Sequence, residues 1–129
     1  AKFETHMVGV GPFIPHVDTP FKNEPAGDAD LTCRILSIIR LMLPNVLLPA
    51  TTALGSIEKN GREKGILHGA NVVMPNLSPL SVRKKYMLYD GKISTDEEAA
   101  ENLMKLKEKI SSIGFEVVTD RGDFKKCEG

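Results

Sequence analysis

The sequence predicts an α/β fold in which short parallel strands alternate with helices. Apolar runs stand at residues 7–14, 46–50 and 70–75, and the stretches between them place apolar residues at helical spacing. Continuous apolar runs are typical of strands covered on both faces, and their alternation with helices indicates a parallel sheet. A closed parallel barrel takes eight strands, so three strands form either a small open sheet or about half of a barrel.

The composition is that of an ordinary globular domain. Of the 129 residues, 41% are apolar and 26% are charged, and 17 basic residues balance 17 acidic ones. A protein that binds nucleic acid usually has a basic excess, and a bilayer-spanning helix needs a run of about 18 apolar residues. The sequence has neither feature, and its first residues lack the pattern of a signal peptide. We therefore expect a cytoplasmic protein with no nucleic-acid or membrane partner.

The first predicted unit is a strand, a proline-rich loop and a helix. The strand covers residues 7–14, and the loop covers residues 15–28. A helix follows over residues 30–43, with Asp30 as its N-cap and Pro44 as its stop. Five residues at helical spacing form the face of this helix that we expect to be buried: Leu31, Ile35, Ile38, Ile39 and Met42.

The second predicted strand, residues 46–50, is short and almost wholly apolar. Pro49 cannot donate a hydrogen bond to a neighbouring strand, so we expect it to mark the end of this one. Thr51 and Thr52 then open a loop, and a short helix follows over residues 61–68.

The third predicted unit begins after a glycine. Gly69 suits the end of the preceding helix, because glycine adopts a positive φ without strain. The third strand covers residues 70–75, and Ser78 caps a helix that extends to Tyr89.

A final helix and a polar tail follow the third unit. Thr95 and Glu98 form a capping-box pattern at the start of the helix. Its apolar residues step by three or four positions: Ala99, Leu103, Leu106, Ile110 and Ile113. Residues 115–118 are predicted as a short strand. We divide the chain into β/α units over residues 1–93 and an appended helix and tail over residues 94–129.

The cysteines and histidines do not form a metal-binding pattern. Cys33 and Cys127 are too far apart for a CxxC or CxxxCxxC motif, and His6, His16 and His68 show no metal-ligand spacing. Cys33 falls on the apolar side of the first helix, so we expect it to be buried. Cys127 lies in the polar tail and is expected to be free.

Candidate site residues follow the three strands, because parallel α/β proteins carry their functional groups at the carboxyl ends of strands. These candidates are His16, the pair Thr51 and Thr52, Met74 and Asn76. Each also has a structural interpretation, as a loop hydrogen-bonding residue, as a partner of free backbone groups, as a core residue or as a turn residue. Threonine hydroxyls beside free backbone N–H groups also suit a carboxylate or a phosphate, so both interpretations stay open for the pair.

Two tyrosines form a further candidate. Tyr86 and Tyr89 stand three positions apart on a predicted helix, so their side chains share one face of it. Both are either packing residues with their hydroxyl groups in solvent, or they offer a ring and a hydroxyl to a ligand at the strand ends. The sequence alone does not separate these two interpretations.

Four strings of the sequence resemble one family of radical S-adenosylmethionine (SAM) enzymes. They are MVGVGPFIPHVDTP at residues 7–20, LPATTALG at residues 48–55, the stretch from Gly61 to Asn76, and YMLYDGK at residues 86–92. Together they are similar to the HydE family of FeFe-hydrogenase maturases, which is related to biotin synthase and methylornithine synthase. The resemblance covers about residues 7–93, whereas the rest of the chain matches only in general character.

The resemblance implies an architecture and a chemistry. The chain would be the C-terminal half of a radical SAM TIM-type β/α barrel, about strands six to eight with their helices, with an appended C-terminal helix. In this family a 4Fe-4S cluster bound by a CxxxCxxC loop cleaves SAM to a 5'-deoxyadenosyl radical, which acts on a small-molecule substrate during hydrogenase active-site assembly. That loop belongs to the first half of the barrel, so this chain alone is expected to be inactive. Residues 93–98 contain no cysteine, so a second cluster is not expected.

The resemblance also implies roles for five residues. Met74 matches a position that lies against the SAM adenosine, and Tyr86 matches one that contacts SAM. Thr51, Thr52 and Tyr89 match positions that line the substrate or anion pocket. No catalytic residue and no metal ligand is expected in this chain.

Partners and alternatives follow from the same resemblance. The missing N-terminal barrel half is an expected partner, and exposed strand edges invite self-association. One alternative is a biotin synthase-like or methylornithine synthase-like enzyme, and the strings at residues 11–16 and 49–53 favour HydE over it. The other is a stand-alone binding module that has lost the chemistry. Residues 1–6 resemble the end of a helix, which favours a reading frame that continues upstream over this second alternative.

Overall fold

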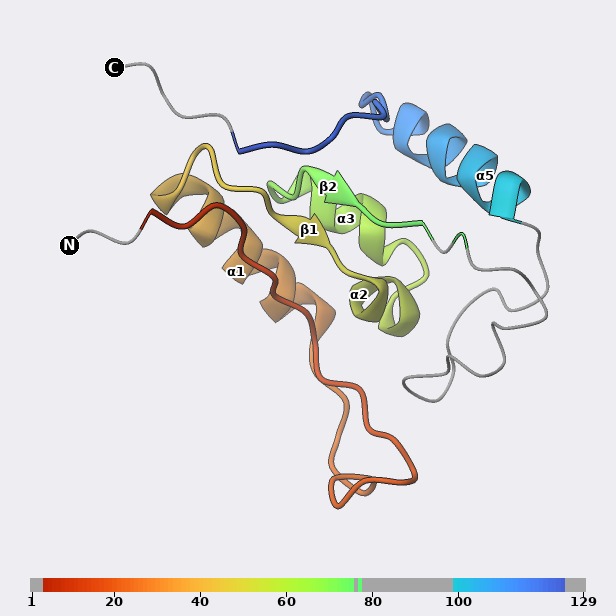
Figure 1. Cartoon of the computed structure of the whole chain (residues 1–129). Helices are drawn as coiled ribbons and strands as arrows, with labels where there is room; N and C mark the ends of the chain where they lie inside the picture. The colour runs from red at the N-terminus through yellow and green to blue at the C-terminus, as the bar shows by residue number, and fades with distance from the viewer. Residues whose placement is uncertain (1–3, 76, 78–98, 125–129) are drawn as a thin grey trace.

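The computed structural model describes residues 4–75, 77 and 99–124, and this part of the chain is a mixed α/β structure with few strands (Figure 1). Helices and strands alternate as predicted, with one short helix that the sequence did not predict. The elements are α1 (Ala29–Met42), β1 (Pro49–Ala50), α2 (Thr52–Ile57), α3 (Gly61–Leu67), β2 (Val72–Val73) and α5 (Ala99–Ser112). No described helix is long and apolar enough to cross a membrane.

The two strands form a parallel sheet, as the alternating pattern predicted. Pro49 of β1 is in register with Val72 of β2, and Ala50 is in register with Val73. Pro49 opens its strand, so the prediction that it marks the strand end was wrong. Proline is tolerated at the first position of a strand, because the hydrogen bond that it cannot donate is not required there.

The first predicted strand is reduced to a single bridge. Met7 forms an isolated parallel bridge with Leu47. Val8 N donates to Leu47 O at 3.0 Å, and Leu47 N donates to His6 O at 2.9 Å. The pairing does not continue, because residues 9–12 contain two glycines and a proline, which weaken a strand or cannot donate to it.

The stretch that contains the Met7 bridge, residues 6–12, is called the first segment below. It lies beside one edge of the β1 strand, and β2 lies beside the other edge. Leu47 directs its backbone groups to the first segment, whereas Leu48 O accepts from Asn71 N at 2.9 Å on the other edge. The side chain of Asn71 completes this contact, since its Oδ1 accepts from Leu48 N at 2.8 Å. Consecutive residues of an extended chain direct their backbone groups to opposite sides, so the spatial order is first segment, β1 and β2.

The N-cap of helix α1 lies two residues before the predicted one. Asp28 is the cap, because its Oδ1 accepts from Asp30 N at 2.7 Å and from Leu31 N at 3.1 Å. Asp30 instead lies in the first turn, where a negative charge is favourable at the positive end of the helix dipole.

The buried face of α1 agrees with the predicted one only in part, at Ile39, which packs against the core. Cys33 is buried, as expected, and so is Leu36. Leu31, Ile38 and Met42, which were also expected to be buried, are more than half exposed. Arg40 explains the orientation, because it lies one turn beyond Leu36 and faces the same side. Its Nε donates to Gly69 O at 2.8 Å, and its Nη1 donates to Pro44 O at 2.7 Å and to Val46 O at 2.9 Å.

Helices α2 and α3 pack tightly against each other. The sequence predicted a loop where α2 forms, and α3 agrees with the predicted helix over residues 61–68. A Cβ atom at Gly61 would collide with the carbonyl group of Leu54, so α3 starts where only glycine fits. After α3, Gly69 adopts a φ of 106°, the positive value for which the sequence predicted glycine.

Helix α5 confirms the last predicted helix within the described residues. Leu106 and Ile110 are buried, and Ile113 packs against the same core. Thr95 and Glu98 lie outside the described residues, as does the predicted helix from Ser78 to Tyr89. The predicted strand at 115–118 does not form, and this segment is an irregular stretch without a paired strand.

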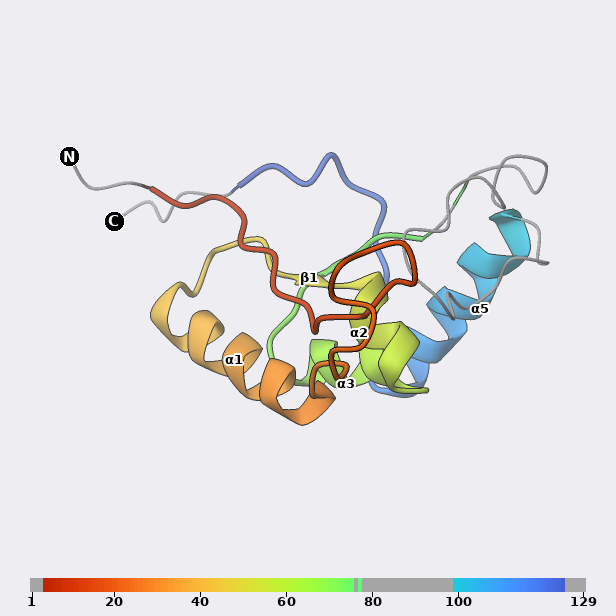
Figure 2. The ribbon, with the colours of Figure 1, turned by 90° about the horizontal axis from the view of Figure 1, so that it is seen from below.

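One hydrophobic core joins all these elements. Figure 2 shows α1, α2 and α3 on one side of the strands. The core consists of Cys33, Leu36, Val46, Leu48, Ala50, Leu54, Ile66, Ala70, Leu106 and Ile110. Because α5 contributes two of these side chains, it is attached to the β/α units by burial of apolar surface.

Candidate functional site at the carboxyl ends of the strands

Thr51 directly follows β1 and caps helix α2. Its φ of −71° and ψ of 155° are extended, and its Oγ1 accepts from Leu54 N at 3.3 Å. This satisfies one of the free N–H groups at the start of the helix. A threonine hydroxyl that accepts one bond still has a proton to donate, so Thr51 can also offer that proton to a ligand.

Gly11 brings the first segment close to Thr51. A Cβ atom at Gly11 would lie 2.8 Å from Thr51 Oγ1, closer than side chains ordinarily approach. The first segment and the end of β1 therefore meet at this threonine.

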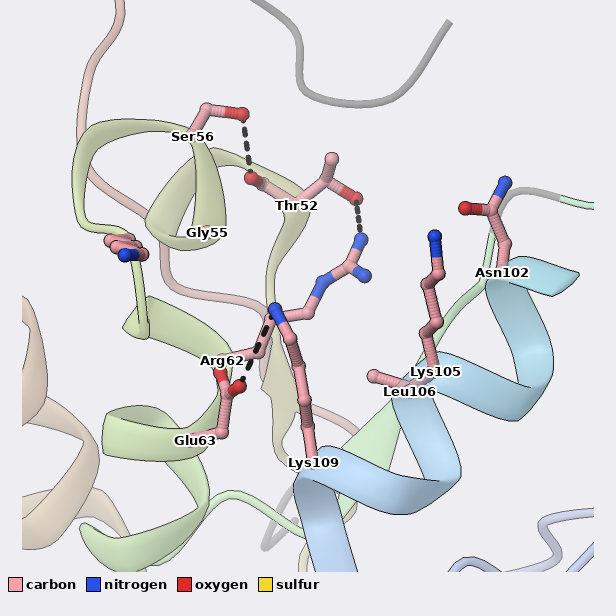
Figure 3. Close-up of a pocket in the computed structure, with 10 residues that line it drawn as sticks. Thr52, Gly55, Ser56, Arg62, Glu63, Asn102, Lys105, Leu106 and Lys109 are labelled. Carbon is pink, nitrogen blue, oxygen red and sulfur yellow. Dashed lines mark hydrogen bonds and ion pairs between the residues drawn. The ribbon is translucent and has the colours of Figure 1, made fainter. Parts of the chain in front are cut away.

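The hydroxyl group of Thr52 bonds to a different neighbour from that of Thr51. It is the first residue of α2, and its Oγ1 accepts from Arg62 Nη2 at 3.4 Å (Figure 3). Its carbonyl oxygen accepts from Ser56 Oγ at 3.0 Å. The formation of α2 thus separates the two adjacent hydroxyl groups, one turned to the first segment and one to α3.

Met74 directly follows β2 and is 52% exposed. Thr51 and Met74 each lie one residue beyond the paired residues Ala50 and Val73, so they occupy matching positions at the same edge of the sheet. Asn76, Tyr86 and Tyr89, the other predicted site residues of this region, lie outside the described residues.

His16 is bound within its own loop. Its Nδ1 accepts from Asp18 N at 3.1 Å, and its carbonyl oxygen accepts from Thr19 N and Thr19 Oγ1 at 3.1 and 2.9 Å. These contacts agree with the interpretation of His16 as a loop hydrogen-bonding residue.

The described residues do not fit a 4Fe-4S cluster. Within the described ranges no three His, Cys, Asp or Glu side chains are grouped so that they could hold a metal ion. Cys33 is 2% exposed in the core, and burial raises the pKa of its thiol, which disfavours the thiolate that a metal requires. Cys127 lies outside the described residues.

The structure also contains a basic pocket that the sequence did not predict. It has a volume of about 310 Å³ and lies between α2, α3 and α5 (Figure 3). Its lining residues are Thr52, Gly55, Ser56, Lys59, Arg62, Glu63, Asn102, Lys105, Leu106 and Lys109. These residues come from segments about 40 positions apart, and only the helical spacing of Lys105 and Lys109 was visible in the sequence.

Comparison with known proteins gives one informative similarity. No protein-family model matches the chain. Over 120 residues the chain is 43% identical to the FeFe-hydrogenase maturase subunit HydE of Thermotoga maritima. The similarity covers 93% of this chain and 34% of the relative, so the chain spans about a third of the length of that protein.

Proposed function

The chain is a homologue of the maturase HydE, as its four strings predicted, and we propose that it is the C-terminal part of a radical SAM enzyme of FeFe-hydrogenase maturation. The observation that carries this proposal is the 43% identity, which extends over nearly the whole chain. The reaction that we propose for the whole enzyme is the cleavage of SAM to a 5'-deoxyadenosyl radical, with SAM and a 4Fe-4S cluster as cofactors. A cytoplasmic location is part of the same proposal.

The strand arrangement supports a place in a β/α barrel. The first segment, β1 and β2 are parallel neighbours, and they correspond to the proposed strands six, seven and eight. In a barrel each of these strands is followed by a helix that covers the outside. Helices α1 and α3 follow the first segment and β1 in this way, and both pack on one side of the strands (Figure 2).

The strand ends support a ligand site on the SAM and substrate side. Met74 presents an exposed apolar side chain, which suits contact with the flat face of an adenine ring. Thr51 keeps a hydroxyl proton for an anionic group of a substrate. We assign Met74 and Tyr86 to SAM and Thr51 and Tyr89 to the substrate or anion. Thr52, the fifth residue expected at this site, turns its hydroxyl to Arg62 of α3 and is not assigned to it.

The outer face of α1 supports a partner for these β/α units. Leu31, Ile38, Leu41 and Met42 lie on the side opposite the core, and Leu41 is 82% exposed. Side chains of this kind usually mark a surface that another element covers. We propose that the rest of the barrel completes these units, and that a second copy of the chain takes its place when the rest is missing.

The test is the formation of 5'-deoxyadenosine. The reading frame that encodes this chain is expressed with its upstream sequence, its iron–sulfur cluster is reconstituted without oxygen, and dithionite and SAM are added. We expect product that depends on the cluster, and none from the 129-residue chain alone. A reconstituted protein that binds a cluster and makes no product would refute the proposal and favour a barrel-derived binding module.

A further inference from the structure

We propose that the basic pocket between α2, α3 and α5 binds the phosphate group of a small molecule. Of the described residues assigned above, neither Thr51 nor Met74 lines this pocket. It lies on the helical side of the strands, and its ligand is independent of SAM cleavage. Its volume of about 310 Å³ is at the small end of the range found for small-molecule sites.

The charge of the pocket is the first argument. Its lining includes four cations, Lys59, Arg62, Lys105 and Lys109, and one carboxylate, that of Glu63. The lining residues thus carry three more positive than negative charges, although the whole chain has a formal net charge of zero. Like charges held close together repel, so a multiply charged anion at their centre stabilises the arrangement. A phosphate dianion balances this excess of positive charge better than a single carboxylate does.

Glu63 pairs with one of the four cations, Lys109. Its carboxylate lies 3.8 Å from Lys109 Nζ, and its side chain is only 13% exposed. Lys105 pairs with an acidic residue outside the pocket lining, since its Nζ lies 3.3 Å from Glu101 Oε1 along the surface of α5. Both partners of that pair are about half exposed, and such surface pairs are weak and screened by salt. Figure 3 shows the side chain of Lys105 extending from α5 on the side of the pocket that faces α2 and α3.

The position of Arg62 is the second argument, because its side chain is held in place. Thr52 Oγ1 accepts from its Nη2 at 3.4 Å, which fixes the guanidinium group beside the pocket (Figure 3). Gly55 leaves room for the stem of the side chain, since a Cβ atom there would lie 3.3 Å from Arg62 Cγ. A planar guanidinium group held in one orientation binds two oxygens of a phosphate at once.

The remaining lining residues suit a small phosphorylated molecule. Asn102 supplies an amide with two N–H donors, and Leu106 forms an apolar floor that is 6% exposed. A binding site that combines a few directed polar groups with an apolar surface is typical for a small organic ligand. The lysines act as point charges around the phosphate, and Arg62 supplies the directional contacts.

The test is a titration of the 129-residue chain with inorganic pyrophosphate, followed by calorimetry and by amide chemical shifts. We expect saturable binding, with shifts at Arg62 and at Lys105 to Lys109, and an affinity that falls as KCl is added. Citrate at the same ionic strength is the comparison anion. Equal binding of citrate would overturn the phosphate assignment, and no saturable binding of pyrophosphate would overturn the site.

Matched variants keep the test specific. Lys105→Gln and Lys109→Gln each remove a charge-assisted contact and should weaken pyrophosphate binding roughly tenfold. Lys107→Gln removes a charge from the exposed surface of the same helix, outside the pocket lining, and should change the affinity less than twofold. An equal loss in all three variants would mean a general charge effect and would overturn the proposal. Gly55→Ala should also weaken binding, because it displaces the stem of Arg62.

Discussion

Gly11 and Thr51 meet where the first segment passes the end of β1, and this contact defines the geometry of the candidate site. A Cβ atom at Gly11 would lie 2.8 Å from Thr51 Oγ1, whereas one at Gly9 meets nothing within 4 Å. We predict that Gly11→Ala lowers the free energy of unfolding by about 1–3 kcal/mol, because the added methyl group displaces the hydroxyl or the first segment. Gly9→Ala is the control and should stay within about 0.5 kcal/mol. Urea denaturation measures both, and equal effects would contradict the contact.

Cys33 gives a prediction for pH. Burial raises the pKa of its thiol, so the folded state holds the proton more strongly than the unfolded state does. The corresponding stability is fully present below the pKa of the unfolded thiol and is lost as pH rises through the higher folded value. We therefore expect the free energy of unfolding to fall above the unfolded value, and to fall less in Cys33→Ala.

A thiol reagent provides the second readout for Cys33. In a Cys127→Ser background, Cys33 should react slowly in the native chain and fast in urea, because the side chain is 2% exposed. Rapid reaction in the native chain would contradict its burial.

At the scale of single residues, the sequence predicted the site only in part. Thr51 and Met74 were predictable, because both directly follow apolar runs that form strands. The different environment of Thr52 was not predictable, because it depends on α2. This helix has six residues, too few to show a helical period of apolar residues in the sequence. Arg62 was missed for the same reason, since its partner Thr52 faces it only once both helices have formed.

At the scale of elements, α1 shows how a polar residue selects between two helix faces. Leu31, Ile38 and Met42 form one apolar stripe, and Cys33 and Leu36 lie on the opposite side. The prediction that Leu31, Ile38 and Met42 are buried was wrong, whereas Ile39 of the same predicted face packs against the core. No local pattern reports that Arg40 bonds to three backbone carbonyl oxygens from later segments.

A substitution of Arg40 tests this explanation. Arg40→Met keeps much of the side-chain volume but leaves the carbonyl oxygens of Pro44, Val46 and Gly69 without their donor. We predict a loss of about 2–4 kcal/mol in the free energy of unfolding, since the bonds to Gly69 O and Val46 O are partly buried. Arg34→Met, at an exposed position of the same helix, is the matched control and should have little effect. Similar losses in both variants would contradict the role of Arg40.

The order of elements was predicted more successfully than their lengths. Two parallel strands and the helices α1, α3 and α5 were expected from apolar runs and helical spacing. Strand lengths were overestimated, because the glycines and the proline in residues 9–12 limit the first strand to one bridge. Residues 115–118 are apolar enough for a strand but have no strand beside them.

At the scale of the whole molecule, the described part has an apolar helix face that is turned away from the core. Leu41 on that face is 82% exposed, and the strand order leaves an edge of the first segment and an edge of β2 without a strand in the described residues. We predict that the 129-residue chain self-associates, because both features favour contact with another chain. Light scattering after size exclusion measures this.

A matched pair of variants sharpens the prediction of self-association. Leu41→Glu places a charge on the exposed apolar face and should shift the chain towards the monomer. Lys107→Glu, on the exposed surface of α5, should leave the distribution unchanged. A monodisperse monomer of the unmodified chain would contradict the prediction outright.

The central claim is that this chain is the C-terminal part of a HydE-type enzyme, and a chimera tests it most directly. The homologous segment of Thermotoga maritima HydE, 34% of that protein, is replaced by this chain, and 5'-deoxyadenosine is measured without oxygen. We expect product from the chimera, and much less product when Met74 is changed to Lys at the proposed adenosine contact. A chimera that folds, binds its iron–sulfur cluster and makes no 5'-deoxyadenosine would contradict the account.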